Sequence, residues 1–183
     1  GLPYAARLVT GLRRPKNRVP GLELAGTVEA VGKDVESLEE GDEVFGWCDG
    51  SFAEYAAVPE DQLLPKPANL TFAQAAVVPI AAFTALQGVG LGRIQPGQKV
   101  LITGASGGVG IYAVQLAKLH GAEVTGVCST PKMDLVRSLG ADHVIDYTRA
   151  DFARNGRSYD LILDLAAHRS VLACKGSLVP GGR

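Results

Sequence analysis

The chain has little cysteine, almost no net charge and no long uninterrupted apolar run. Its three cysteines, Cys48, Cys128 and Cys174, lie far apart in 183 residues and form no CxxC pair. This sparse, odd count argues against a disulfide framework and a cysteine-based zinc site, and it favours a reduced, cytoplasmic protein. The net charge of −1 gives no electrostatic reason to expect nucleic acid or an anionic membrane as a partner.

The longest apolar stretch, residues 73–86, is too short to span a bilayer and is interrupted by Pro79. No signal peptide is recognisable, and the chain begins with Gly1 rather than Met. It stops at Arg183, directly after a turn at residues 179–182 that would lead into another strand. We therefore expect a fragment that is cut at both ends.

Glycine is abundant: it makes up 23 of the 183 residues, compared with a usual share of about 7%. This abundance indicates many tight turns and places where the backbone approaches a ligand closely. Before residue 70, short apolar or alternating runs at 22–31, 43–47 and 52–58 are separated by Gly, Pro and Asp. Such runs predict strands of a β-rich domain, residues 1–70, whose first strands are missing.

After residue 70 the pattern becomes helical. Thr71 followed by Gln74 is typical of a capping box for a helix that starts at Phe72. Pro79 ends that helix and can serve as the first residue of the next one, which is expected to run to about Gln87.

From Lys99 onward, predicted strands and helices alternate, as in a Rossmann-type doubly wound parallel α/β sheet. The strands are expected at 99–103, 123–127, 143–145 and 160–165, and the helices at 109–120, 131–139 and 169–175. A complete dinucleotide-binding fold has six strands, so the sheet within residues 71–183 is expected to be incomplete.

Residues 99–122, KVLITGASGGVGIYAVQLAKLHGA, contain a strand, a glycine-rich turn and a helix in that order. This arrangement is typical of a loop that binds a pyrophosphate at a helix N-terminus. The alternative is a glycine-rich turn without a ligand. The residues expected to bind the cofactor are Gly104, Ala105, Ser106, Gly107, Gly108, Val109 and Gly110.

The end of the second predicted strand indicates which cofactor binds. NAD enzymes place a carboxylate there, whereas this chain has Ser129, Thr130 and Lys132, and Glu123 lies at the wrong end of the strand. A hydroxyl and a cation favour a 2′-phosphate, so we expect NADP(H) in preference to NAD(H). Alternatively, Thr130 caps the following helix and Lys132 is a solvated first-turn residue.

With these features together, the chain resembles a medium-chain dehydrogenase/reductase of the zinc-free, quinone oxidoreductase-like branch. Residues 20–28, PGLELAGTV, are similar to the GxExxGxV strand and turn of that family's GroES-like catalytic domain. Residues 41–46, GDEVFG, resemble its next turn, and residues 97–110 resemble its dinucleotide loop. Residues 83–85 resemble the segment whose threonine, here Thr84, lies beside the nicotinamide.

The resemblance implies further assignments. Leu22 stands where zinc-dependent members carry a metal-binding histidine, so no metal is expected. Lys132 and Tyr147 match the spacing of a lysine and a tyrosine that contact the 2′-phosphate in NADPH-using relatives; the alternative for Tyr147 is a packed aromatic. Residues 164–168, DLAAH, depart from the family's usual Val-Gly-Gly. His168 is better interpreted as a surface residue than as a proton donor.

The resemblance also implies NADPH-dependent hydride transfer to a quinone or an activated enone or alkene, without a metal. The expected partners are a small-molecule substrate and, in the full-length protein, a second copy in a homodimer. No residue receives a catalytic assignment. Alternatives are a metal-free alcohol or aldehyde oxidoreductase, or a nucleotide-binding protein without turnover. A methyltransferase is disfavoured because Ser129 replaces the acidic residue usual in that fold.

Overall fold

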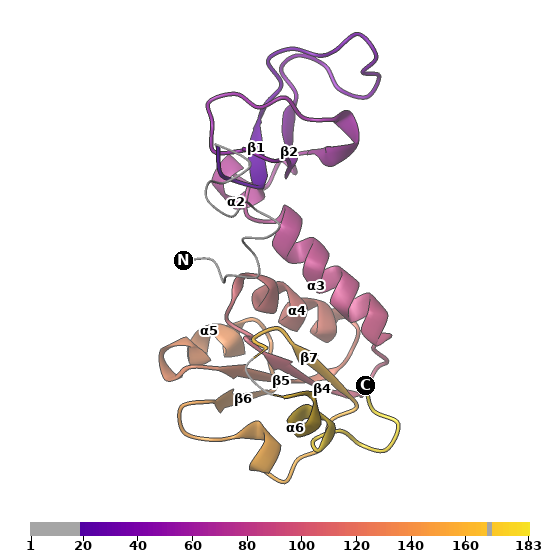
Figure 1. Cartoon of the computed structure of the whole chain (residues 1–183), viewed down its shortest axis with the longest axis vertical. Coiled ribbons are helices and arrows are strands. Elements are labelled where there is room, and N and C mark those ends of the chain that lie inside the picture. The colour runs from indigo at the N-terminus through magenta and orange to yellow at the C-terminus, as the bar shows by residue number, and fades with distance from the viewer. Residues whose placement is uncertain (1–18, 168–169) are drawn as a thin grey trace, which may run out of the picture. The chain divides into compact units, whose positions relative to one another are not determined.

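A computed structural model of the chain describes residues 19–167 and 170–183 (Figure 1). The chain forms two compact units, Gly1–Ile80 and Ala81–Arg183, here called unit 1 and unit 2. The division expected after residue 70 stays a prediction. His168 lies outside the described residues.

Unit 1 contains a three-stranded antiparallel sheet of order β1-β2-β3. The strands are β1 (Glu23–Thr27), β2 (Glu43–Trp47) and β3 (Leu63–Pro65), with the short helix η1 (Glu60–Gln62) before β3. Glu23 pairs with Trp47 and Thr27 with Glu43, so β1 and β2 are aligned over their whole length. The prediction for residues 43–47 is confirmed, and that for residues 22–31 is confirmed over β1.

The strand predicted at residues 52–58 is wrong. These residues form bends and extended chain without ladder pairing, and Phe52 and Tyr55 are 74% and 73% exposed. The Phe52 N–H donates to the carbonyl of Pro20 at 2.9 Å, outside any strand ladder. Alternating apolar residues form a strand only where a partner strand and a covering layer are available, and the described part of unit 1 provides neither at this segment.

The capping box at Thr71 is confirmed. The Thr71 hydroxyl accepts from the Gln74 N–H at 3.2 Å, and the Gln74 side chain accepts from the Thr71 N–H at 3.0 Å. The helix α2 (Phe72–Ala75) is short, and Pro79 opens α3 (Pro79–Gly92) as expected. The helix α3 continues five residues past the predicted end, because Val89 is 1% exposed and extends its buried side.

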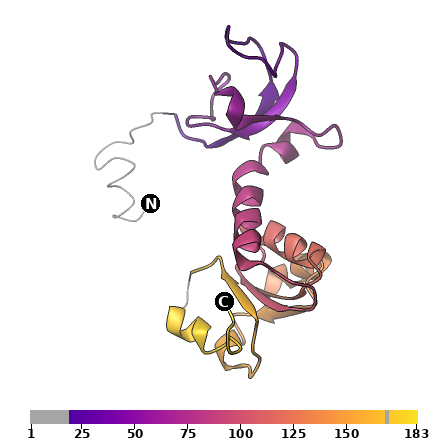
Figure 2. The same cartoon turned by 90° about the vertical axis from the view of Figure 1, so that its right-hand side faces the viewer.

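Unit 2 contains the predicted parallel sheet, with strand order β6-β5-β4-β7 (Figures 1 and 2). Its strands are β4 (Lys99–Thr103), β5 (Glu123–Cys128), β6 (His143–Asp146) and β7 (Leu161–Asp164). Its helices are α4 (Gly108–Leu119), η2 (Thr130–Lys132), α5 (Met133–Ser138), η3 (Phe152–Arg154) and α6 (Val171–Lys175). The fold class and all four strand positions predicted for this region are confirmed.

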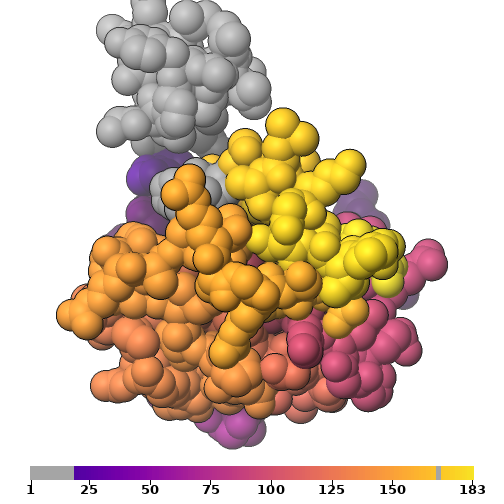
Figure 3. All heavy atoms as spheres, turned by 90° about the horizontal axis from the view of Figure 1, so that it is seen from below, coloured from indigo at the N-terminus to yellow at the C-terminus, as the bar shows by residue number. Residues whose placement is uncertain are grey.

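The sheet of unit 2 is covered on both faces, because side chains alternate along each strand. Val100 and Ile102 point into one core with residues of α3, α4 and α5, whereas Leu101 packs on the other face with Phe152 and Tyr159. Figure 3 views this second side, where the segments that follow β6 and β7, orange to yellow, lie together. No helix among the described residues is both long and apolar enough to traverse a bilayer.

Candidate functional site

The strand order of unit 2 reverses at β4. From β4 the chain proceeds to β5 and then β6 on one side, and it returns to place β7 on the other side. Ligands of open parallel sheets bind at the carboxyl ends of the strands where such a reversal occurs. In this chain the reversal brings together residues 104–107, which follow β4, and residues 165–167, which follow β7.

Glycines shape the loop after β4. Gly104 has a φ of +63°, which favours glycine. A Cβ atom on Gly110 would lie 2.1 Å from the Gly104 carbonyl oxygen and 2.8 Å from the Ala105 backbone, so only glycine allows α4 to approach the loop this closely. The predicted order of strand, glycine-rich turn and helix is confirmed, and the structure adds that the helix packs closely on the loop.

The predicted loop residues differ in what they offer a ligand. Ala105 is fully buried and its N–H donates to the Val127 carbonyl at 3.1 Å, so it belongs to the sheet. Gly107 and Gly108 are exposed, and Gly107 is the N-cap of α4 without a side chain to satisfy the first turn. The first N–H groups of a helix have no intrahelical acceptor, and the helix dipole is positive there. This end of α4 is suited to bind a pyrophosphate.

A hydrogen-bond bridge joins the two strands at the reversal. The Thr103 hydroxyl donates to Asp164 Oδ1 at 2.5 Å and accepts from the Ala166 N–H at 3.2 Å. Asp164 Oδ1 also accepts from the N–H of Ala167, whose φ is +50°. The sequence analysis did not identify Thr103 or Asp164. The available signal was a polar residue at the end of each of two apolar strands.

The residues expected at the 2′-phosphate lie at one corner of the sheet. Cys128 at the end of β5 pairs with Asp146 at the end of β6, and the Tyr147 N–H donates to the Cys128 carbonyl at 3.1 Å. Ser129 and Tyr147 therefore leave the sheet side by side. Lys132 closes the next turn by donating its N–H to the Ser129 carbonyl at 2.9 Å, and the Lys132 side chain is exposed.

Asp146 organises this corner, and the sequence analysis did not identify it because the predicted strand ended one residue earlier. Its carboxylate is buried and accepts from the hydroxyl of Thr130 and from the N–H and hydroxyl of Thr148, the latter two at 2.9 and 2.7 Å. The hydrogen bonds from Thr130 and then Thr148 lower the pKa of Asp146 below its usual value. Thr130 has one hydroxyl proton and gives it to Asp146.

Thr84 lies on α3, which runs beside the loop. A Cβ on Gly108 would lie 4.0 Å from Ala81, and a Cβ on Gly88 would lie 4.0 Å from Leu163. Thr84 falls between Ala81 and Gly88 along the helix, and its side chain is exposed. Its predicted place beside the nicotinamide stays a prediction.

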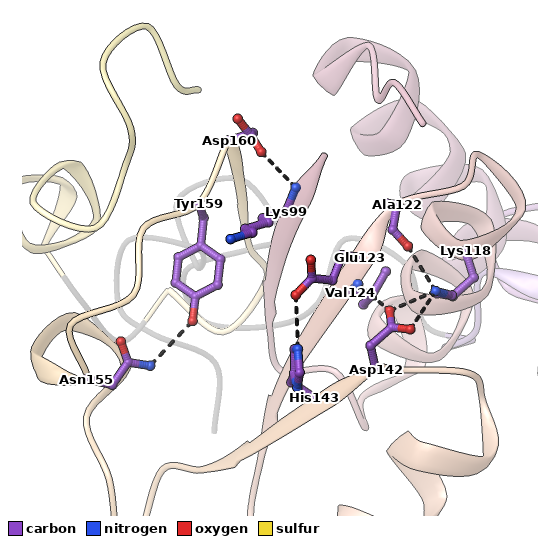
Figure 4. Close-up of polar contacts among 10 residues, drawn as sticks. All are labelled: Lys99, Lys118, Ala122, Glu123, Val124, Asp142, His143, Asn155, Tyr159 and Asp160. Atoms are coloured by element: carbon purple, nitrogen blue, oxygen red, sulfur yellow. Dashed lines mark hydrogen bonds and ion pairs between the residues drawn. The ribbon is translucent and has the colours of Figure 1, made fainter. Parts of the chain in front are cut away.

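The amino-terminal ends of the strands, opposite the candidate site, are also polar, but the polar groups there are paired with one another (Figure 4). Glu123 and His143 are 3.0 Å apart across the starts of β5 and β6, and Lys118 Nζ lies 2.7 Å from Asp142. These contacts hold the amino ends of the strands beside a cavity of about 630 Å³. Glu123 therefore lies at the opposite end of β5 from Ser129, as expected.

The described residues of unit 1 carry no zinc ligand at the position that the resemblance indicates. Leu22, at the position of the family's histidine ligand, is 56% exposed and has no ligating atom. Within residues 19–167 and 170–183, no three His, Cys, Asp or Glu side chains come together as a metal site requires. Unit 1 instead contains a cavity of about 610 Å³ lined by β1 and the 51–58 segment, where the buried Ser51 Oγ has no partner among the described residues.

Family profiles match both parts of the chain. Residues 4–68 match the profile described as alcohol dehydrogenase GroES-like domain, and residues 108–183 match the one described as zinc-binding dehydrogenase. The 2-methylene-furan-3-one reductase of Solanum lycopersicum is 42% identical over 162 residues, and an NADPH-dependent alkenal/one oxidoreductase of Arabidopsis thaliana is 43% identical over the same length. Each alignment covers 82% of this chain and 42% of the relative, so the chain spans less than half of those proteins.

Solved structures are similar over nearly the whole chain. The quinone oxidoreductase from Coxiella burnetii superimposes with a TM-score of 0.87 at 31% identity, and the alignment covers 97% of this chain and 57% of that one. The CurK enoyl reductase gives a TM-score of 0.86 at 31% identity, with 97% and 56% covered.

Proposed function

Because the chain belongs to the medium-chain dehydrogenase/reductase superfamily, in its quinone oxidoreductase-like branch, we propose that the whole protein is an NADPH-dependent reductase of quinones or activated carbon–carbon double bonds. The names of its relatives, which include alkenal/one and quinone oxidoreductases, support this reaction class. The observation that carries the proposed cofactor preference is that Ser129, Lys132 and Tyr147 lie in turns that leave the adjacent ends of β5 and β6, where the Asp146 carboxylate is engaged by two threonines.

The residues of unit 2 fit a dinucleotide. The N-terminus of α4 would hold the pyrophosphate, and Thr84 with residues 165–167 would lie at the nicotinamide end. Ser129, Lys132 and Tyr147 would hold the 2′-phosphate. When bound, NADPH would supply the hydride. Asp146, the carboxylate at the end of β6, already accepts from the hydroxyls of Thr130 and Thr148 and is engaged within the fold.

The bridge between β4 and β7 prepares the nicotinamide end. The hydrogen bonds of Thr103 with Asp164 and Ala166 fix residues 165–167 at the end of β7. These residues lie close to the loop after β4, because a Cβ on Gly104 would be 3.4 Å from the Ala166 nitrogen. Ala166 and Ala167 leave space above the strand ends because their side chains are small. Orientation of a bound group by such fixed backbone is the main contribution that a protein makes to hydride transfer.

We also propose that no metal takes part. Leu22 provides no ligand, so the charge that develops on the substrate oxygen would be stabilised by hydrogen-bond donors. The homodimer and the cytoplasmic location expected from the sequence remain proposals. Relatives with chloroplastic and mitochondrial names make a tagged full-length protein the direct test of location.

Binding of NADPH and NADH to the purified chain tests the cofactor. We expect NADPH to bind roughly 10- to 100-fold more tightly, since one charge-assisted hydrogen bond contributes about 1.5–3 kcal/mol. Lys132→Ala should remove most of this difference and leave NADH binding unchanged, whereas Lys175→Ala, an exposed lysine on α6, should change neither. Equal dissociation constants in the unaltered chain would exclude the preference.

Turnover by the full-length protein tests the reaction. NADPH oxidation should be fastest with quinones and enones in a panel that also contains aldehydes. Preferential reduction of aldehydes would support the alcohol or aldehyde oxidoreductase alternative. Cofactor binding without oxidation on any member of the panel would support a nucleotide-binding protein without turnover.

A further inference from the structure

We infer that Arg149 is a further binding residue for the 2′-phosphate of the cofactor and that Asp146 positions it. The inference rests on the proposed NADPH preference and adds a cation that no sequence pattern indicates. It follows from three features of the corner: the path of the chain after β6, the shared buried carboxylate, and the exposure of the guanidinium.

The chain turns sharply after β6. The Asp146 carbonyl accepts from the N–H groups of both Arg149 and Ala150, at 3.1 and 2.9 Å. This turn keeps Arg149 close to the end of β6 instead of letting the chain continue away from the sheet. Tyr147, in the same turn, is tied to the end of β5, so the turn that carries Arg149 lies beside Ser129.

One carboxylate connects the two turns that surround the corner. Asp146 accepts from Thr130, in the turn after β5, and from Thr148, in the turn after β6. The two threonine hydroxyl oxygens are themselves 3.4 Å apart. Both hydroxyl protons point to Asp146, so neither threonine has a side-chain donor left for a phosphate. A phosphate at this corner therefore depends on other side-chain donors, namely Ser129, Tyr147 and cations.

Arg149 is the cation that the turn supplies. Its Nε lies 3.7 Å from Asp146 Oδ2, and its side chain is 78% exposed. A guanidinium has five N–H donors in a planar fork that matches phosphate oxygens, and Asp146 holds Arg149 by an ion pair rather than by a hydrogen bond. The nearest acidic residue on α5, Asp134, is paired with Arg137 at 2.8 Å. Lys132 and Arg149 thus give the corner two cations against one buried carboxylate.

Calorimetric titration of the chain with 2′,5′-ADP and with 5′-ADP tests the inference, because the two probes differ in the 2′-phosphate and need no nicotinamide site. Arg149→Gln should weaken 2′,5′-ADP binding roughly tenfold and leave 5′-ADP unchanged. Arg149→Lys should recover part of the loss. Arg154→Gln removes the same charge from η3 and should affect neither probe.

Asp146→Asn tests positioning. This substitution should weaken 2′,5′-ADP binding. Adding Arg149→Gln to it should weaken that binding by a smaller factor than Arg149→Gln does in the unaltered chain, because both substitutions disturb the same arrangement. Independent, additive effects would contradict a positioning role for Asp146. If Lys132→Ala weakens 2′,5′-ADP but Arg149→Gln does not, the inference is wrong while the proposed cofactor stands. If the unaltered chain binds both probes equally, the proposed NADPH preference itself fails.

Discussion

Unit 1 and unit 2 differ in how firmly their residues are held. In the described part of unit 1 the buried apolar side chains include Val44, Cys48 and Ala75, whereas unit 2 buries all of β4 except Lys99. Unit 1 leaves Phe52 and Tyr55 more than 70% exposed. A densely packed sheet fixes the residues that follow each strand, which explains why unit 2 supports a residue-level account of cofactor binding and unit 1 does not support one of the substrate.

Glycine-to-alanine substitutions give the largest expected contrast between the units. Gly110→Ala would place a Cβ 2.1 Å from the Gly104 carbonyl oxygen, whereas a Cβ on Gly26 in β1 has no neighbour within 4 Å. Alanine favours a helix over glycine by about 1 kcal/mol, but the backbone clash should outweigh this and cost about 3 kcal/mol or more. Chemical denaturation should show a large loss for Gly110→Ala and a change below about 0.5 kcal/mol for Gly26→Ala.

The NADPH affinity of the same two variants provides the control. Gly110→Ala should abolish binding and Gly26→Ala should preserve it. A Gly110→Ala protein with unchanged stability and affinity would show that the loop relaxes, and the role assigned to this glycine would be wrong.

Removing a threonine hydroxyl in each unit gives the second contrast. Thr103→Val keeps the side-chain shape but leaves Asp164 without its 2.5 Å donor in a buried bridge, which should cost about 1–3 kcal/mol. Thr71→Val removes the exposed cap of α2 and should cost about 1 kcal/mol. Chemical denaturation measures the loss of stability in both variants, and Thr103→Val should also weaken NADPH binding. An equal or larger loss from Thr71→Val would contradict the contrast.

Sequence patterns predicted what depends on neighbouring residues. The capping box at Thr71, the strands of unit 2 and the glycine loop are all determined within about ten residues of chain. The bridge between Thr103 and Asp164 was missed because it joins residues 61 positions apart. The strand predicted at residues 52–58 failed for the complementary reason, since alternation cannot indicate whether a partner strand is present.

Acidification gives the third contrast. Hydrogen bonds from Thr130 and Thr148 lower the pKa of Asp146, and at Asp142 burial raises the pKa but the hydrogen bonds from Lys118 and Val124 outweigh it. A carboxyl whose pKa is lower in the folded state stabilises the fold above its unfolded pKa, near 4, and the contribution is lost as pH falls through the folded pKa. The free energy of unfolding of unit 2 should therefore be constant between about pH 5 and pH 8 and decrease below about pH 4.

Circular dichroism during denaturation at several pH values measures this decrease. Asp142→Asn should make it shallower. In unit 1 the exposed Glu60, whose pKa is lowered by hydrogen bonds from Ser37, should contribute less because water screens it. A stability that rises on acidification would contradict the assignment.

The smallest expected effect is at Ala167. Its φ of +50° disfavours a side chain by about 1–2 kcal/mol, while glycine adds about 0.4–1 kcal/mol of unfolded-state entropy. Ala167→Gly should therefore stabilise the chain by roughly 0.5 kcal/mol. The neighbouring Ala166→Gly has no positive φ to relieve and should destabilise it, so thermal unfolding of the pair separates strain relief from a general effect of glycine.

The strand order β6-β5-β4-β7 also bears on how the chain folds. The strands β4, β5 and β6 pair with sequence neighbours, but β7 must return to β4, and Lys99 is 61 residues from its partner Asp160. The cost of closing a loop grows with its length by about 0.6 kcal/mol per doubling, and distant pairings form slowly. We expect β7 to dock last, so the loop proposed to hold the pyrophosphate would exist before the proposed nicotinamide end of the site is assembled.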